Sequence, residues 1–140
     1  MKRLLNLSVY WFLAEHNTND MSVKRIAYLN RRAPYGTAYA FEALESVLAA
    51  AAFEQEVALI FTDDGVYQLL DNQNPNVIDM KNPAKAYLAL EGYDIERIYI
   101  SKKALEERGL SADDLVIPVE VLSDIEIAEL LSQQDAVLSF

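Results

Sequence analysis

The most constraining feature of the sequence is a continuous apolar run at residues 56–62, EVALIFT. A run without alternating polar and apolar residues is typical of a strand that is covered on both faces. Such strands occur mainly in parallel sheets, because the helices that join parallel strands lie across both faces. The run therefore favours an α/β fold.

Strand-like and helix-like segments alternate along the rest of the chain. The strand-like runs are residues 24–30, 95–101, 115–122 and 135–140, and the helical ones are 37–53, 83–92, 102–108 and 124–133. Short joints between alternating elements predict a three-layer α/β/α sandwich with a five-stranded, mostly parallel sheet, in one domain at residues 21–140.

Several residues mark where these elements begin and end. Pro83 suits the first turn of a helix, and Ser101 and Ser123 are typical helix caps, the latter with Glu126 placed for a capping box. Gly109 is positioned to end a helix in the left-handed conformation. Residues 71–82 are polar and are expected to form a surface loop. Pro118 cannot donate to a ladder, so the fourth strand should lie at a sheet edge or contain a bulge.

Residues 1–20 differ from the remainder of the chain. They superficially resemble a secretion signal, but polar residues interrupt the apolar stretch. Leu4, Leu7 and Trp11 fall near one helical face, so packing on the domain or on a partner is an alternative. We favour a third interpretation, in which Met21 is the native start and residues 1–20 are an extension that is not native.

The charge of the chain disfavours whole classes of partner. It carries 22 acidic against 12 basic residues, a net charge of −10. Such a surface repels phosphate backbones, so we expect no direct binding of nucleic acid. No apolar run reaches the roughly 18 residues that a membrane-spanning helix needs. We therefore expect no membrane contact.

The chain contains no cysteine, and its one histidine is His16. This composition removes disulfides, thiolate nucleophiles, cysteine-ligated metals and persulfide chemistry. From Met21 onward the commonest general base and metal ligand, histidine, is also missing. Carboxylates, Lys, Tyr and Ser remain, and they form no recognisable combination of a nucleophile, a base and an orienting group.

In open α/β sheets the working site gathers beyond the carboxyl ends of the strands. Three loops follow predicted strands there: residues 31–37, 63–67 and 101–103. The first contains Arg31, Arg32, Pro34, Tyr35, Gly36 and Thr37. With one glycine, no lysine and a proline that lacks an N–H donor, it fits a phosphate cradle poorly. We favour a tight turn, and flavin or nucleotide binding is the alternative.

The other two loops allow similar pairs of interpretations. Asp63, Asp64 and Gly65 could help to hold Mg²⁺, but they fit a turn with an acidic helix start better. Tyr67, like Tyr35, could stack on a ligand or belong to a protein interface. The adjacent lysines at 102 and 103 are expected to be solvated. We predict no metal and no cofactor.

Separated motifs then point to a family. They are KRIAYLN at 24–30, APYGT at 33–37, DDGVYQL at 63–69, GYDIE at 92–96, EERGL at 106–110 and DAVLSF at 135–140. Together they resemble the DsrF/TusC subunits of the DsrEFH/TusBCD sulfurtransferase family across residues 21–140. The resemblance implies a flavodoxin-like sheet with the strand order 4-3-2-1-5, which would put strand four at an edge.

The resemblance also implies a cytoplasmic heterohexamer with two copies each of three related subunits. The partners would be DsrE/TusD-like and DsrH/TusB-like subunits, and the acceptor of sulfur would be a DsrC/TusE-like protein. The DsrE/TusD-type subunit carries a persulfide cysteine just after strand three, at the head of a short helix that ends in Arg-Gly. Counting back from Arg108 and Gly109 places Ser101 at or near that position.

A serine hydroxyl ionises far above pH 7 and cannot hold a persulfide. The resemblance therefore implies membership of the complex without the reaction. Two pathways use such complexes, sulfur oxidation and wobble 2-thiouridine synthesis in tRNA. The run YLNRRAPYGT at 28–37 resembles the sulfur-oxidation branch, because the thiolation branch more typically reads APHGT.

Overall fold

A computed structural model describes residues 22–140 of the chain. Residues 1–21 lie outside the described part. The interpretation of residues 1–20 as an extension, with Met21 as the native start, therefore stays a prediction.

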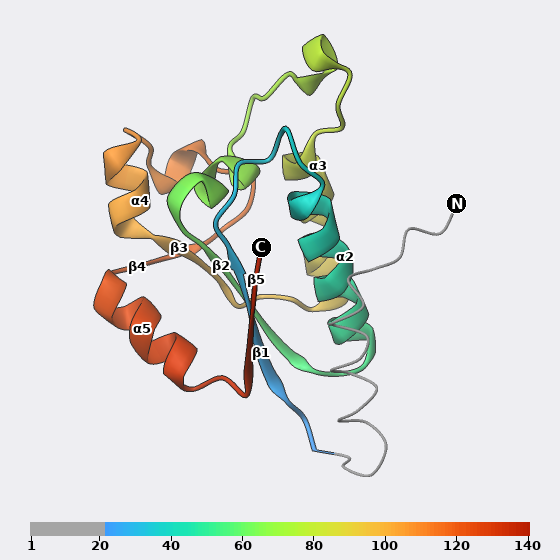
Figure 1. Ribbon diagram of the computed structural model, residues 1–140, viewed down its shortest axis with the longest axis vertical. Coiled ribbons are helices and arrows are strands. Elements are labelled where there is room, and N and C mark those ends of the chain that lie inside the picture. The colour runs from blue at the N-terminus through green and yellow to red at the C-terminus, as the bar shows by residue number, and fades with distance from the viewer. Residues whose placement is uncertain (1–21) are drawn as a thin grey trace.

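Five strands form one sheet, and every neighbouring pair is parallel. The order across the sheet is β4-β3-β2-β1-β5, which confirms the expected fold class and strand order (Figure 1). The strands are β1 (Arg25–Asn30), β2 (Glu56–Phe61), β3 (Ile98–Ser101), β4 (Glu120–Leu122) and β5 (Ala136–Ser139).

Helices cover both faces of this sheet, as Figure 1 shows with α2 and α3 on one side and α5 on the other. The α-helices are α2 (Tyr39–Ala52), α3 (Pro83–Tyr87), α4 (Lys102–Glu107) and α5 (Asp124–Ser132). Four 3₁₀ helices complete the described chain: η1 (Asp63–Leu69), η2 (Pro75–Ile78), η3 (Leu88–Tyr93) and η4 (Ala112–Asp114).

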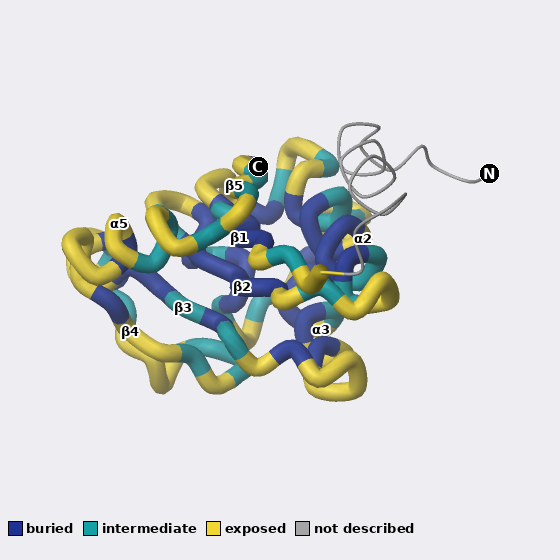
Figure 2. The backbone as a smooth tube through the Cα atoms, turned by 90° about the horizontal axis from the view of Figure 1, so that it is seen from below, coloured by how far each residue is buried: buried dark blue, intermediate teal, exposed yellow. Residues whose placement is uncertain are grey.

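The two faces of the sheet bury very different amounts of apolar surface. Alternate strand residues, such as Ile26 and Tyr28, pack with α2, α3 and α4 in a large core. The opposite face has a small core of Ala27, Ile60, Leu122 and Ile127, of which only Ile127 comes from a helix, α5. Figure 2 shows α5 as a mostly exposed element beside buried strands. Most of the hydrophobic stabilisation therefore comes from the α2 side.

The predicted signals at helix ends are confirmed. The hydroxyl of Ser101 accepts a hydrogen bond from the Ala104 N–H at 3.1 Å, and Gly109 has a φ of +64° just beyond α4. Ser123 and Glu126 form a reciprocal capping box at the start of α5. The N–H of Ser123 lowers the pKa of the Glu126 carboxyl, because it binds the ionised form.

The fourth strand is much shorter than the predicted residues 115–122. Before it, the chain pairs with the end of η1: the Val116 N–H donates to the Leu69 carbonyl at 2.9 Å. Pro118 separates this pairing from β4, which lies at the sheet edge as expected. The third strand likewise begins only at Ile98, because the Ile95 N–H bonds back to the Leu90 carbonyl.

Other boundaries also differ from the prediction. The turn expected at residues 63–65 is the beginning of η1, which runs without a break to Leu69. The predicted surface loop at 71–82 contains η2, and the predicted helix at 83–92 is an α-helix only to Tyr87 before it tightens into η3. Periodicity does not distinguish 3₁₀ from α-helical turns over so few residues.

One glycine allows η1 to lie against the end of β1. A Cβ atom on Gly65 would be 2.0 Å from the carbonyl oxygen of Asn30, and the glycine is buried. Because backbone cannot move aside as a flexible side chain can, only glycine fits there. The glycine of the DDG motif is thus needed for the close packing of η1 against β1.

We predict that Gly65→Ala lowers the free energy of unfolding by at least about 2 kcal/mol, because η1 must move away from β1. Urea unfolding followed by circular dichroism measures the change. The matched control is Gly92→Ala, since a Cβ at Gly92 meets nothing within 4 Å. We expect it to stay within about 1 kcal/mol of the parent chain. Equal losses in the two variants would contradict the packing argument.

Candidate functional site

The loops that follow β1 and β2 meet at the carboxyl edge of the sheet, as predicted. The Thr62 N–H donates to the Asn30 carbonyl at 3.0 Å, and the Gly65 N–H donates to the Thr62 carbonyl at 2.8 Å. Asn30 itself is fully buried and donates from its amide to the Tyr28 and Ile60 carbonyls. The two loops therefore share one backbone network.

A buried glutamine holds the 31–37 loop in place. The Gln68 amide nitrogen donates to the Arg32 carbonyl at 2.8 Å, and its amide oxygen accepts from the Tyr87 hydroxyl at 2.6 Å. Tyr87 is fully buried, and this burial raises the pKa of its phenol well above 10. Two hydrogen bonds between uncharged groups thus link the 31–37 loop, η1 and α3. Sequence reasoning missed both side chains.

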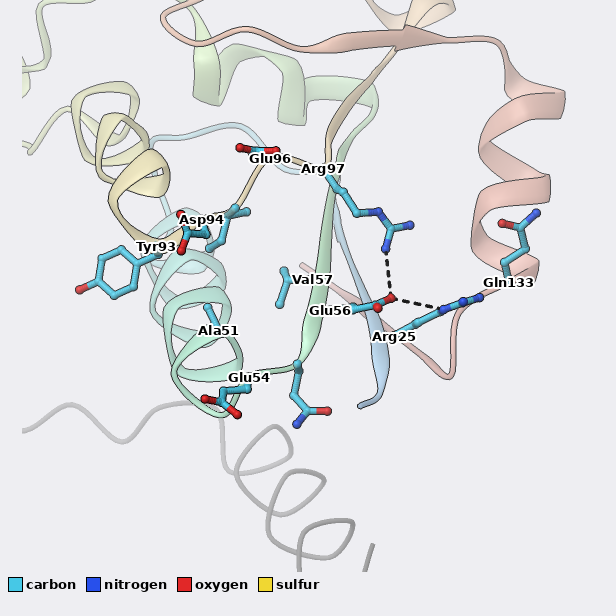
Figure 3. A pocket seen from close by; sticks show the side chains of 12 residues that line it. Arg25, Ala51, Glu54, Glu56, Val57, Tyr93, Asp94, Glu96, Arg97 and Gln133 are labelled. Carbon is cyan, nitrogen blue, oxygen red and sulfur yellow. Dashed lines mark ion pairs between the residues drawn. The ribbon is translucent and has the colours of Figure 1, made fainter. Parts of the chain in front are cut away.

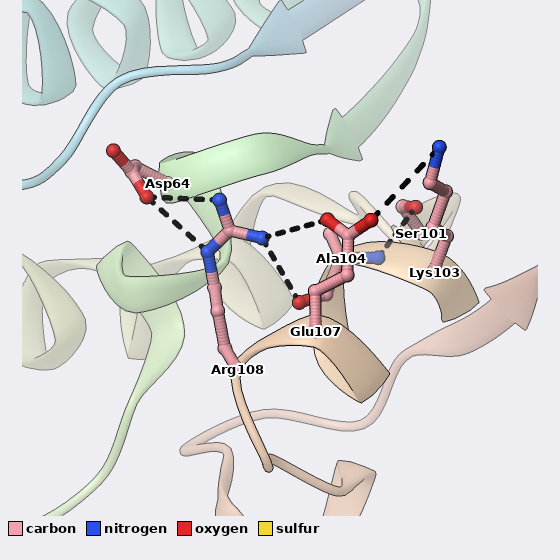
Figure 4. Close-up of polar contacts among 6 residues, drawn as sticks. All are labelled: Asp64, Ser101, Lys103, Ala104, Glu107 and Arg108. Carbon is pink, nitrogen blue, oxygen red and sulfur yellow. Dashed lines mark hydrogen bonds and ion pairs between the residues drawn. The ribbon is translucent and has the colours of Figure 1, made fainter.

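An arginine at the end of α4 connects this helix, which follows β3, to η1, which follows β2. Arg108, just after α4, donates from Nε and Nη2 to one carboxylate oxygen of Asp64, at 3.2 and 2.9 Å (Figure 4). Its Nη1 donates to the Ala104 carbonyl, and its guanidinium carbon lies 5.9 Å from the centre of the Tyr67 ring. Asp64 is therefore engaged in an ion pair with Arg108, which ties η1 to α4.

Ser101 lies at the end of β3 and is 4% exposed. Figure 4 shows its hydroxyl directed to the backbone of α4, where it caps the helix. The neighbouring lysines are exposed and form ion pairs along the helix, Lys102 with Glu106 and Lys103 with Glu107, both at 3.9 Å. These contacts fit solvated surface lysines and a structural serine.

The remaining residues of the 31–37 loop are used mainly for structure. The Arg31 guanidinium donates to the Ser139 hydroxyl at 2.9 Å, and Arg32 stacks on the Tyr39 ring at 4.2 Å. Pro34 is buried, Gly36 has a φ of +89°, and Thr37 is exposed. The hydroxyl of Tyr35 is buried without a partner among the described residues, and burial raises its pKa. The loop is a turn into α2, as predicted.

Metal and cofactor binding gain no support from these contacts. Among residues 22–140, no group of three or more His, Asp or Glu side chains is arranged to hold a metal ion. Asp64 is paired with an arginine, and the 31–37 loop presents no lysine to a phosphate. The Mg²⁺ and flavin alternatives therefore rest on loop position alone.

A cavity of about 770 Å³ opens at the other end of the sheet, by the amino ends of β1 and β2 (Figure 3). Glu56 lies between Arg25 and Arg97, at 3.4 and 3.9 Å. Glu54, Asp94 and Glu96 add further carboxylates to its lining. In this lining the carboxylates outnumber the arginines, and both arginines are paired with Glu56, so the cavity disfavours the phosphate of a nucleotide or flavin.

Comparison with known proteins identifies the family. The DsrE/DsrF-like family model matches residues 24–140. The chain belongs to the DsrE/DsrF-like family. DsrF of Allochromatium vinosum, named an intracellular sulfur oxidation protein, is 47% identical over 84% of this chain and 97% of its own length. A TusC homologue from Vibrio parahaemolyticus is 39% identical over 84% of this chain and all of its own length.

Two solved structures have a similar fold. The crystal structure of the YchN protein of E. coli matches with a TM-score of 0.73 and 25% identity, over 84% of this chain and 100% of that chain. MTH1491 of Methanobacterium thermoautotrophicum matches with a TM-score of 0.58 at 15% identity, over 85% of this chain and all of its own, and so shares the fold alone. Within residues 22–140, no helix is both long and apolar enough to span a membrane.

We predict that Tyr87→Phe lowers the free energy of unfolding by about 1–2 kcal/mol, because the buried Gln68 oxygen loses its donor. Thermal unfolding measures the change. Tyr93→Phe is the control, since Tyr93 is half exposed and its hydroxyl makes no hydrogen bond in the described structure. The control should stay within about 0.5 kcal/mol. If Tyr87→Phe loses no more stability than the control, the hydrogen bonds from Tyr87 through Gln68 to Arg32 do not stabilise the loop.

Proposed function

We propose that this protein is a non-catalytic subunit of a DsrEFH/TusBCD-type sulfur-relay complex. It would pack against the persulfide-carrying DsrE/TusD-like subunit and position it, together with a DsrH/TusB-like subunit, in a cytoplasmic heterohexamer. A DsrC/TusE-like protein would accept the sulfur. Membership of the DsrE/DsrF-like family and the likeness to DsrF support this role.

The observation that carries the proposal is the absence of any thiol in the chain. Sulfur that passes between proteins travels on a thiolate as a persulfide. By family resemblance Ser101 stands at or near the position at which we expect the partner's cysteine, and here its hydroxyl is buried and caps α4. The same place in the fold would therefore serve structure in this subunit and chemistry in another.

Similarity to the relatives supports sulfur oxidation as the pathway. Identity is 47% to the sulfur-oxidation protein DsrF and 39% to the TusC homologue of Vibrio parahaemolyticus. Two other TusC homologues, from Aliivibrio fischeri and Vibrio vulnificus, are 35% identical. These values favour dissimilatory sulfur oxidation over tRNA thiolation. Dissimilatory sulfite-reductase genes beside the gene for this chain would support that choice, and their absence would favour the TusC-type role.

We predict that the chain forms a stable heteromeric complex when it is co-expressed with the DsrE-like and DsrH-like proteins of the same organism. Size-exclusion chromatography with light scattering measures the assembly. The purified chain alone, incubated with a persulfide donor, should gain no sulfur by intact-mass spectrometry. A chain that elutes apart from both proteins, or that acquires covalent sulfur by itself, would refute the proposal.

We predict that Ser101→Ala leaves sulfur transfer by the assembled complex unchanged while it destabilises the subunit by about 1 kcal/mol through loss of the helix cap. Radiolabelled sulfur transfer to the acceptor and urea unfolding measure the two effects. Replacing the cysteine of the DsrE-like subunit by serine is the comparison, and it should abolish transfer. Loss of transfer in the Ser101 variant of an intact complex would assign chemistry to this serine.

A further inference from the structure

The negative charge of the protein is concentrated in its C-terminal part. After Arg108 the chain has no Lys, Arg or His, but it has seven acidic residues: Asp113, Asp114, Glu120, Asp124, Glu126, Glu129 and Asp135. This part of the chain therefore contributes −7 of the net charge of −10. It contains β4, α5 and β5, which are the two sheet edges and the helix on the thinly covered face.

Some of these carboxylates have local partners, and others do not. Asp114 and Glu126 close capping boxes, and Asp135 accepts from the Arg25 N–H. The carboxylates of Glu120, Asp124 and Glu129 make no hydrogen bond or ion pair within residues 22–140. These three exposed charges remain available to a partner.

An exposed aliphatic side chain lies on the same helix as two of these carboxylates, Asp124 and Glu129. Ile125 is 73% exposed on α5, and Ala128, Glu129 and Ser132 share its helical face at spacings of three, four and seven. Of this helix, Ile127 is buried and Leu130 and Leu131 are partly buried, and most of its other residues are exposed (Figure 2). We call Glu120, Asp124, Ile125, Ala128, Glu129 and Ser132 the α5 surface.

We infer that the α5 surface docks a protein partner that presents Lys or Arg side chains around an apolar contact. Opposite charges across an interface favour the correct encounter, whereas like charges oppose it. A second copy of this chain would bring the same carboxylates face to face and is therefore disfavoured. Phosphate backbones and anionic lipid surfaces are repelled for the same reason.

The inference rests on the proposed function, because it assigns the partner to the other subunits of the sulfur-relay complex. Ile125 would supply the apolar centre of the contact, and Glu129 and Asp124 would form its charged rim. Interfaces of this kind have an apolar core surrounded by polar residues. The arrangement also gives α5, which buries little against its own sheet, a second surface to pack on.

The test compares two double variants of the full chain for binding to the purified DsrE-like and DsrH-like proteins by biolayer interferometry. Ile125→Ser with Glu129→Lys alters the α5 surface. The control, Ile78→Ser with Glu45→Lys, makes the same chemical changes at the exposed tip of η2 and on the opposite layer in α2. All four side chains are exposed, so both variants should fold, and circular dichroism verifies this.

We predict that the α5 variant binds at least tenfold more weakly than the parent chain, whereas the control binds within about twofold. Raising the salt from about 0.05 to 0.5 M should weaken binding of the parent chain and of the control more than binding of the α5 variant, because salt screens exposed charges. Equal binding by all three chains would overturn the inference and leave the proposed function standing. No binding by the parent chain would overturn both.

Discussion

The packing of η1 against the end of β1 is the constraint on which the site region depends. Gly65 has no Cβ, so its backbone lies directly against the Asn30 carbonyl, and Gln68 on the same short helix reaches the Arg32 carbonyl. Asp64 then pairs with Arg108 beyond β3. One 3₁₀ helix thus fixes the positions of the loops after three neighbouring parallel strands, in the place where α/β folds gather their functional groups.

The contacts seen in those loops hold the structure together. Lys102 and Lys103 form ion pairs with glutamates at the surface, and the buried side chains of Gln68 and Tyr87 form a neutral hydrogen bond with each other. The serine at the end of β3 caps a helix. A subunit that positions a reactive partner needs such rigidity more than it needs a nucleophile, and this agrees with a family in which related chains share one fold.

The sequence predicted the fold well and the site contacts only in part. Parallel pairing followed from the apolar run at 56–62, because it depends on local chemistry. β4 does lie at the sheet edge, but Pro118, which suggested this, precedes the strand. The predicted strand starts at residues 95 and 115 were wrong, and β3 and β4 begin at Ile98 and Glu120. The Ile95 N–H bonds to the Leu90 carbonyl and the Val116 N–H to the Leu69 carbonyl, and these hydrogen bonds compete with the ladder. Gln68 gave no signal, because a glutamine in a polar motif looks the same whether it is exposed or buried.

By itself the sequence determined the alternation of strands and helices, the caps at Ser101 and Ser123, and the absence of any thiol, because each is a property of a residue and its near neighbours. Only the tertiary structure decided which distant groups meet. The pairing of Asp64 with Arg108, the burial of Tyr87 and the exposure of Ile125 depend on how η1, α3 and α5 pack on the sheet. Contacts between residues far apart in the chain arise from that packing, and no local pattern encodes them.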